Sequence, residues 1–109
     1  MTADGDVYVV DDDASYLRSL ARLLSSEGYR VHPFPSARDF LESLTMQARG
    51  CIVADLKMPD MDGLGLQAAL AELQCRMPIV FLTGVGDISS TVRAMRGGAV
   101  DFLEKCAPK

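Results

Sequence analysis

The stretch that decides the fold is CIVADLKMPDMDG, residues 51–63. It begins with four apolar residues, and a short apolar run of this kind is typical of a buried strand. Asp55 follows the run directly, and a loop rich in proline, aspartate and glycine comes soon after it. In open α/β sheets, ligands bind at the edge formed by the carboxyl ends of the strands. We therefore expect Asp55 to lie at that edge and to be part of a functional site.

Three further apolar runs, residues 7–10, 79–82 and 100–103, predict strands that also end in polar groups. The groups that follow these runs are Asp11-Asp12-Asp13, Thr83-Gly84 and Glu104-Lys105. We expect these strand ends to converge on Asp55. Residues 29–32 alternate between polar and apolar side chains and precede Pro33, which predicts an edge strand that ends there.

Between the predicted strands, apolar residues recur with the spacing of one helix face. This spacing predicts helices over residues 14–27, after Ser36, from about Gly63 and after Asp87. Ser36 and Asp87 are residue types that cap helix N-termini through their side chains, and we expect both to do so.

The predicted elements alternate as βαβαβαβαβ, which implies a parallel sheet with helices on both faces. A fifth helix is expected after the last strand, and no pattern for one is present. We expect residues 1–109 to form one domain that is truncated before this helix. One sheet face should then stay partly bare beside the first helix, where self-association or a partner chain would cover it.

Composition excludes several classes of function. Hydrophobic residues make up 49% of the 109 residues, enough for a core, and the net charge of −4 argues against direct contact with nucleic acid. No window approaches a membrane span of about 18 apolar residues, and the acidic N-terminus is no signal peptide, so we expect a cytoplasmic protein. The three cysteines, Cys51, Cys75 and Cys106, fit neither a disulfide framework nor a zinc site.

The acidic strand ends indicate a metal site. If the strands that end at Asp11-Asp12 and at Asp55 are neighbours, three carboxylates crowd together and need a cation to stay ionised. Oxygen ligands at a half-open site suit Mg²⁺, which binds through one or two carboxylates plus phosphate. Thr83 offers a hydroxyl and Lys105 an ammonium to the oxygens of a transferred phosphoryl group. This chemistry amounts to phosphorylation of Asp55.

Each of these residues also has a simpler interpretation. The three consecutive aspartates could form a loop that caps the first helix, and Asp13 is the best candidate for that cap. Thr83 could be a turn residue, and Lys105 could be solvated. The full set at successive strand ends favours the functional interpretation.

The motifs argue against two other classes of protein. A phosphatase with an aspartate nucleophile needs a second acid two residues after it, where this chain has Lys57. A flavodoxin-like cofactor binder needs a loop rich in Ser, Thr or Gly after the first strand, where this chain has three aspartates that repel phosphate.

Four stretches of the chain resemble receiver domains of two-component response regulators. They are VVDDD (9–13), DLKMPDMDG (55–63), FLTG (81–84) and GAVDFLEK (98–105). The residues of these stretches are most similar to those of the subfamily that drives LuxR-type DNA-binding domains, as in nitrogen-fixation regulators. The resemblance implies a flavodoxin-like, three-layer, doubly wound fold with a five-stranded parallel sheet in the order 2-1-3-4-5.

The resemblance also implies a role for each matching residue. Asp55 is expected to be the phosphoacceptor, and Thr83 and Lys105 to bind the phosphoryl oxygens. Phe102 is expected to be the switch aromatic that moves inward as Thr83 is drawn toward the phosphate. The expected ligands of Mg²⁺ are Asp12, Asp55 and the backbone carbonyl of Lys57, with Asp11 acting through a metal-bound water.

The function implied is a signalling switch and not an enzyme, beyond self-catalysed phosphorylation and dephosphorylation. A sensor histidine kinase would supply the phosphoryl group, and the aspartyl phosphate would change the conformation to regulate transcription through a DNA-binding domain outside this chain. A stand-alone receiver acting by protein–protein contact is the alternative.

One departure from the family pattern concerns the chain after Lys105. The family usually has a proline there, preceded by a cis peptide bond, and this chain has Cys106. Because a cis bond before a non-proline residue costs about 2.5–4 kcal/mol, we expect a trans Lys105–Cys106 bond or a loose loop.

Overall fold

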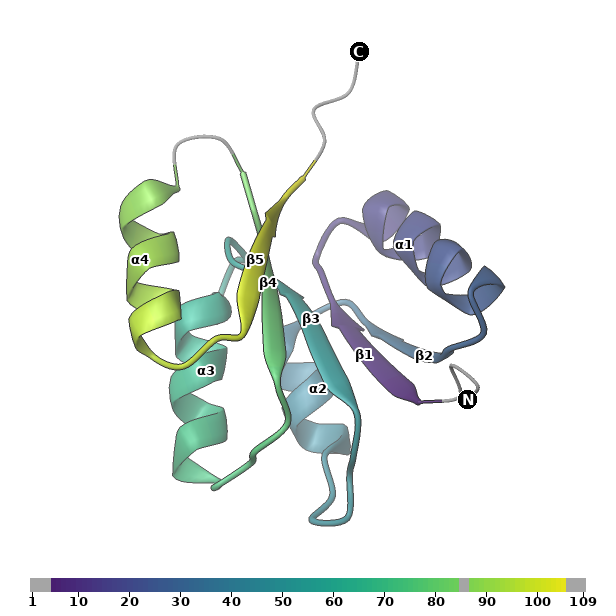
Figure 1. Ribbon diagram of the computed structural model, residues 1–109, viewed down its shortest axis with the longest axis horizontal. Coiled ribbons are helices and arrows are strands. Elements are labelled where there is room, and N and C mark those ends of the chain that lie inside the picture. The colour runs from purple at the N-terminus through teal and green to yellow at the C-terminus, as the bar shows by residue number, and fades with distance from the viewer. Residues whose placement is uncertain (1–4, 85–86, 106–109) are drawn as a thin grey trace.

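Strands and helices alternate along the chain as the sequence predicts. The computed structural model describes residues 5–84 and 87–105 (Figure 1). The elements are β1 (Asp6–Val10), α1 (Ala14–Ser26), β2 (Arg30–Phe34), α2 (Ala37–Ser43), β3 (Cys51–Asp55), α3 (Gly63–Glu72), β4 (Ile79–Thr83), α4 (Ile88–Arg96) and β5 (Asp101–Glu104).

All five strands pair in parallel in one sheet, in the order β2-β1-β3-β4-β5. The expected strand order and flavodoxin-like fold are thereby confirmed. β3 is central, between β1 and β4, and the strands end in register at one edge: Val10 lies beside Ala54, and Asp55 beside Leu82. The residues that follow β1, β3, β4 and β5 therefore meet at the edge where open α/β sheets bind ligands.

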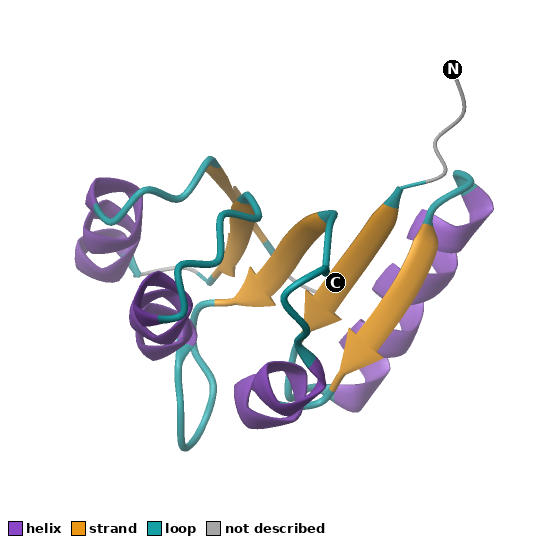
Figure 2. Ribbon diagram, turned by 90° about the horizontal axis from the view of Figure 1, so that it is seen from below, coloured by secondary structure: helices purple, strands orange, loops and turns teal. Residues whose placement is uncertain are grey.

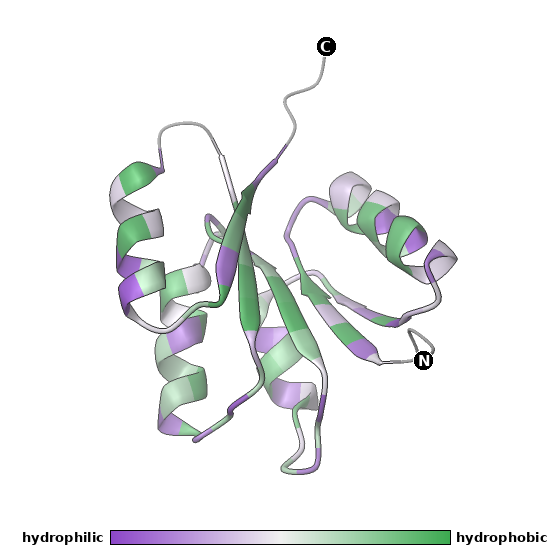
Figure 3. Cartoon of the chain, viewed as in Figure 1, coloured by the Kyte–Doolittle hydropathy of each residue, from purple (hydrophilic) through white to green (hydrophobic). Residues whose placement is uncertain are grey.

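The helices cover the two faces of the sheet unequally. Among the described residues, α1 alone lies on one face, and α2, α3 and α4 lie on the other (Figures 1 and 2). The larger core fills the second face, where Phe40, Ile52, Leu66 and Phe81 are fully buried. The smaller core packs Leu17 of α1 on the first strands. Figure 3 shows the hydrophobic residues concentrated in the central strands between these layers.

The predicted bare face is present beside α1. Val53 packs in the core under α1 and pairs with Val80, so Leu82 and its register partner Leu103 point to that same face. Leu82 is 4% exposed, whereas Leu103 is 56% exposed. The α1 layer therefore stops short of β5, and all four residues of β5 are exposed.

Several predicted strand boundaries differ from the structure by one or two residues. β2 runs on to Phe34 and includes Pro33, which the sequence predicted to end the strand. Proline is tolerated there because β2 is an edge strand that pairs only with β1. β5 begins one residue later than predicted, at Asp101.

The predicted caps are found at α1 and α2, α3 has a cap that the sequence analysis did not name, and α4 departs from the prediction. The side chains of Asp13 and Ser36 accept backbone N–H groups at the starts of α1 and α2, and Asp62 does so for Gly65 in α3. Asp87 occupies the N-cap position of α4, but its side chain accepts no hydrogen bond from the described residues of that helix.

Across the described part of the chain, no helix has the length and apolar character that crossing a bilayer requires.

Candidate functional site

Asp55 ends the central strand and lies almost buried at the sheet edge. It is 7% exposed, and the backbone N–H of Lys57 approaches its Oδ1 at 3.4 Å. The apolar residues before it anchor its position, because Ile52 and Ala54 are fully buried in the core. The strand therefore places this carboxylate at the edge, as predicted.

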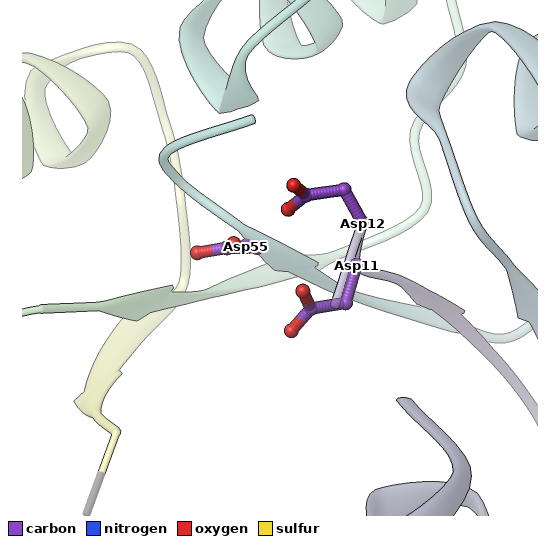
Figure 4. Close-up of side chains that lie close together, drawn as sticks. All are labelled: Asp11, Asp12 and Asp55. Atoms are coloured by element: carbon purple, nitrogen blue, oxygen red, sulfur yellow. The ribbon is translucent and has the colours of Figure 1, made fainter. Parts of the chain in front are cut away.

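Asp11 and Asp12 reach the same place from the end of β1. Carboxylate oxygens of Asp11, Asp12 and Asp55 all lie within 4.8 Å of one another (Figure 4). Asp11 is fully buried and accepts the backbone N–H of Asp13 at 2.9 Å, whereas Asp12 is exposed. Asp13 caps α1, as the simpler interpretation predicts for it, whereas Asp11 and Asp12 lie close to Asp55.

Lys105 connects the ends of three strands. Its Nζ lies 2.8 Å from Oδ2 of Asp11 and 3.3 Å from Oδ2 of Asp55. Its backbone N–H donates to the carbonyl of Thr83 at 2.8 Å, which fixes the chain where it leaves β5. The ammonium also sits 4.4 Å from the ring centroid of Tyr16, within the range of a cation–π contact.

Asp11, Asp12 and Asp55 bring three carboxyl groups to the site, and Lys105 brings one ammonium. Burial raises the pKa of Asp55 to about 6, the charge of Asp11 adds to the rise, and Lys105 opposes it. Burial alone would lower the pKa of Lys105, but its hydrogen bond to Asp11 and the charges of both carboxylates outweigh this and raise it. The one ammonium thus contacts two of the three carboxylates, and the pKa of Asp55 stays above its usual value.

Thr83 and Phe102 lie on the other side of this group. Thr83 ends β4 and is 2% exposed, and Phe102, in β5, is 40% exposed. Both line a hollow of about 460 Å³ between the ends of β4 and β5 and helix α4. The structure therefore puts the two predicted switch residues on one cavity. We call Asp11, Asp12, Asp55, Thr83 and Lys105 the strand-end site.

Comparison with known proteins identifies the family. The chain matches the response regulator receiver domain over residues 7–109. It belongs to this family. Receiver domains of response regulators are signalling switches, and the sequence-based recognition is confirmed.

The relatives of this receiver domain include transcriptional regulators. The chain is 50% identical over 99 residues to nodulation protein W of Bradyrhizobium diazoefficiens, covering 91% of the chain and 44% of that protein. It is 46% identical over 105 residues to the transcriptional regulatory protein FixJ of the same species, covering 96% and 51%. It superposes on full-length FixJ from B. japonicum with a TM-score of 0.90 at 44% identity, covering 98% and 53%. The chain spans about half the length of these relatives.

Receiver domains generally use Mg²⁺ at an acidic pocket, and the residues of this one fit a divalent cation. Oδ2 of Asp11 is buried and lies 2.8 Å from the Lys105 ammonium. Three carboxylates with facing oxygens supply the hard ligands that Mg²⁺ prefers. Asp11, Asp12 and Asp55 could therefore hold a metal ion.

The sequence did not point to Tyr16, and it predicted a different role for Asp87. Tyr16 lies under Lys105, and its only sequence signal is its place in the first turn of α1, three residues after the capping Asp13. Asp87 binds neighbouring loops in place of its helix, which no local pattern reveals. The predicted features at Cys106 and the Lys105–Cys106 bond lie outside the described residues.

Proposed function

We propose that this receiver domain is the phosphorylation-dependent switch of a two-component system, with Asp55 as its phosphoacceptor. The observation that carries the proposal is the convergence of one lysine and three aspartates on the carboxyl ends of neighbouring strands. A sensor histidine kinase is the proposed donor. In this proposal the phosphoryl group is transferred from the kinase to Asp55, and the chain needs no active site beyond the strand-end site.

In the proposed step, a carboxylate oxygen of Asp55 attacks the phosphorus of a phosphohistidine. An oxygen–phosphorus bond forms, the phosphorus–nitrogen bond breaks, and the imidazole leaves as a neutral ring after taking up a proton. The pKa of about 6 leaves Asp55 mostly ionised at pH 7, so that it can act as nucleophile. Asp12, Asp55 and the backbone carbonyl of Lys57 would hold Mg²⁺, with Asp11 acting through a water. The ion would supply positive charge against the phosphoryl oxygens.

The remaining residues would bind the product and report its presence. Lys105, 3.3 Å from Asp55, is placed to transfer its ammonium contact to a phosphoryl oxygen. The hydroxyl of Thr83 would donate to another, which draws the end of β4 inward. The side chain of Phe102 then has the adjoining hollow of about 460 Å³ to enter. Such a switch works only because the phosphoryl contacts differ between the two arrangements.

We infer that the output is regulation of transcription through a DNA-binding domain elsewhere in a longer protein. The support is the chain's coverage of about half of relatives that are transcriptional regulatory proteins. The receiver domain itself carries a net charge of −4, which disfavours direct contact with nucleic acid.

Mass spectrometry after incubation with acetyl phosphate and Mg²⁺ tests the phosphoacceptor. An adduct of about 80 Da is expected on the wild-type chain. It should be absent from Asp55→Asn and strongly reduced when EDTA removes the cation. Asp60→Asn is the matched control, since Asp60 is an exposed aspartate in the loop after β3. An adduct of undiminished yield in Asp55→Asn would overturn the assignment.

A further inference from the structure

Asp87 stands at the start of α4 but does not act as a helix cap. Aspartate at this position ordinarily accepts a backbone N–H of the first helical turn, as Asp62 does for Gly65 in α3. The Asp87 carboxylate accepts none from the described residues of its helix, although only 15% of the side chain is exposed. Its contacts lie elsewhere.

The Asp87 carboxylate connects the two loops that border the strand-end site. Its Oδ2 accepts the backbone N–H of Gly84 at 3.0 Å, and its Oδ1 lies 3.7 Å from Nζ of Lys57. Gly84 directly follows Thr83, and Lys57 comes two residues after Asp55. One carboxylate therefore holds a donor from the loop after β3 and another from the loop after β4.

A phosphoryl group on Asp55 would attract the same donors. It brings about one to two additional negative charges and several strong acceptor oxygens to this edge. Lys105 already serves Asp11 and Asp55. Lys57 and the Gly84 N–H are further donors in the described part of the two loops, and Asp87 holds both.

We propose that Asp87 is a positioning residue that competes with the phosphoryl group for Lys57 and the Gly84 N–H, and so favours the unphosphorylated arrangement of the two loops. This inference rests on the proposed function, because it needs a phosphoryl group at Asp55. By linkage, contacts that Asp87 loses when the phosphoryl group binds weaken the binding of that group by the same free energy. Removing the Asp87 charge should therefore tighten phosphoryl binding.

The expected effect is moderate because Lys57 is largely exposed. Its side chain is 65% exposed, and exposed ion pairs contribute little, while the hydrogen bond from Gly84 is charge-assisted and better shielded. Asp87→Asn keeps an acceptor for Gly84 and removes the charge. We expect the dissociation constant for a phosphoryl mimic to fall by about two- to tenfold.

Beryllium fluoride with Mg²⁺ is a stable phosphoryl mimic for this test, with binding measured by calorimetry. The variants are Asp87→Asn, Lys57→Gln and the double variant. If Asp87 acts by withholding Lys57, the gain from Asp87→Asn shrinks in the Lys57→Gln background. A purely structural role at the helix start would leave the gain independent of Lys57. Asp62→Asn is the matched control, an N-cap aspartate that binds its own helix, and should leave affinity unchanged.

Chemical unfolding of each variant separates the switch from helix stability. Asp87→Ser provides a second variant that still favours a helix start and lacks the charge, and it should also bind the mimic more tightly. Unchanged or weaker binding by folded Asp87→Asn and Asp87→Ser, beside a wild type that binds, would overturn the role of Asp87 alone. A wild type that neither binds the mimic nor takes up phosphate would overturn the proposed function and this inference together.

Discussion

The two sides of the strand-end site differ in how tightly they are packed. On the β1–β3 side, Asp11 and Asp55 are buried and the strands before them lie between helices on both faces. On the β4–β5 side, Phe102 and Leu103 are largely exposed and a hollow separates β5 from α4. The difference suggests a division of labour in which the fixed side holds the chemistry and the loosely packed side changes position.

The largest expected contrast is between two phenylalanines in register across β4 and β5. Phe81 is fully buried and its partner Phe102 is 40% exposed. Phe81→Ala should lower the free energy of unfolding by about 3–5 kcal/mol, because it leaves a cavity in the larger core. Phe102→Ala should lower it by less than about 1 kcal/mol. Urea unfolding of both variants measures this, and equal losses would contradict the division.

Asp55→Asn should stabilise the fixed side when no divalent cation is present. Its pKa of about 6 lies above the value near 3.8 of an unperturbed carboxyl, so the folded state binds more protons between these values. Stability therefore falls as the pH rises through that range, and the full penalty is present at pH 7.5. Neutral asparagine avoids it, and we expect a gain of about 1–3 kcal/mol.

Urea unfolding in EDTA at pH 3.5 and pH 7.5 checks this expectation. The variant and the wild type should differ little at the lower pH, where both carry an uncharged side chain at residue 55. A variant that is no more stable than the wild type at pH 7.5 would show that Lys105 fully compensates the buried charge.

The smallest expected effect is weak self-association through the exposed β5. In the described part of the chain, β5 is an edge strand that pairs with β4 alone, and Leu103 is 56% exposed on the face beside α1. A second copy can cover both features. Leu103→Ser should reduce the rise of the sedimentation coefficient with concentration, whereas Leu23→Ser, which changes a 58% exposed leucine on α1, should not. A monomeric wild type at high concentration would contradict this expectation.

Much of the fold was predictable because the signals are local. The apolar runs and the helical spacing gave all five strands and four helices, and strand order came from the resemblance to receiver domains. The predicted end of β2 was wrong because, in the described sheet, β2 has one neighbour strand, and an edge strand of this kind tolerates Pro33. That neighbour relation is a tertiary fact.

For the strand-end site, too, the sequence predicted some features and not others. Residue types and their places at strand ends were enough to predict which side chains meet, since parallel strands bring their carboxyl ends to one edge. The hydrogen-bond partners of a side chain were not predictable where its own helix and a distant segment compete for that side chain. Asp13 and Asp87 both look like helix caps in sequence, but only Asp13 caps, because Lys57 and the Gly84 N–H lie within reach of Asp87.

The sequence by itself determined the alternation of strands and helices and the acidic and basic groups at the strand ends, because periodicity and strand termination are set by near neighbours in the chain. Only the tertiary structure decided the distances within that group, the raised pKa of Asp55, the contact of Lys105 with Tyr16 and the direction of the Asp87 carboxylate. Burial, charge and hydrogen bonding between distant segments fix these properties, and they exist only once the sheet has assembled.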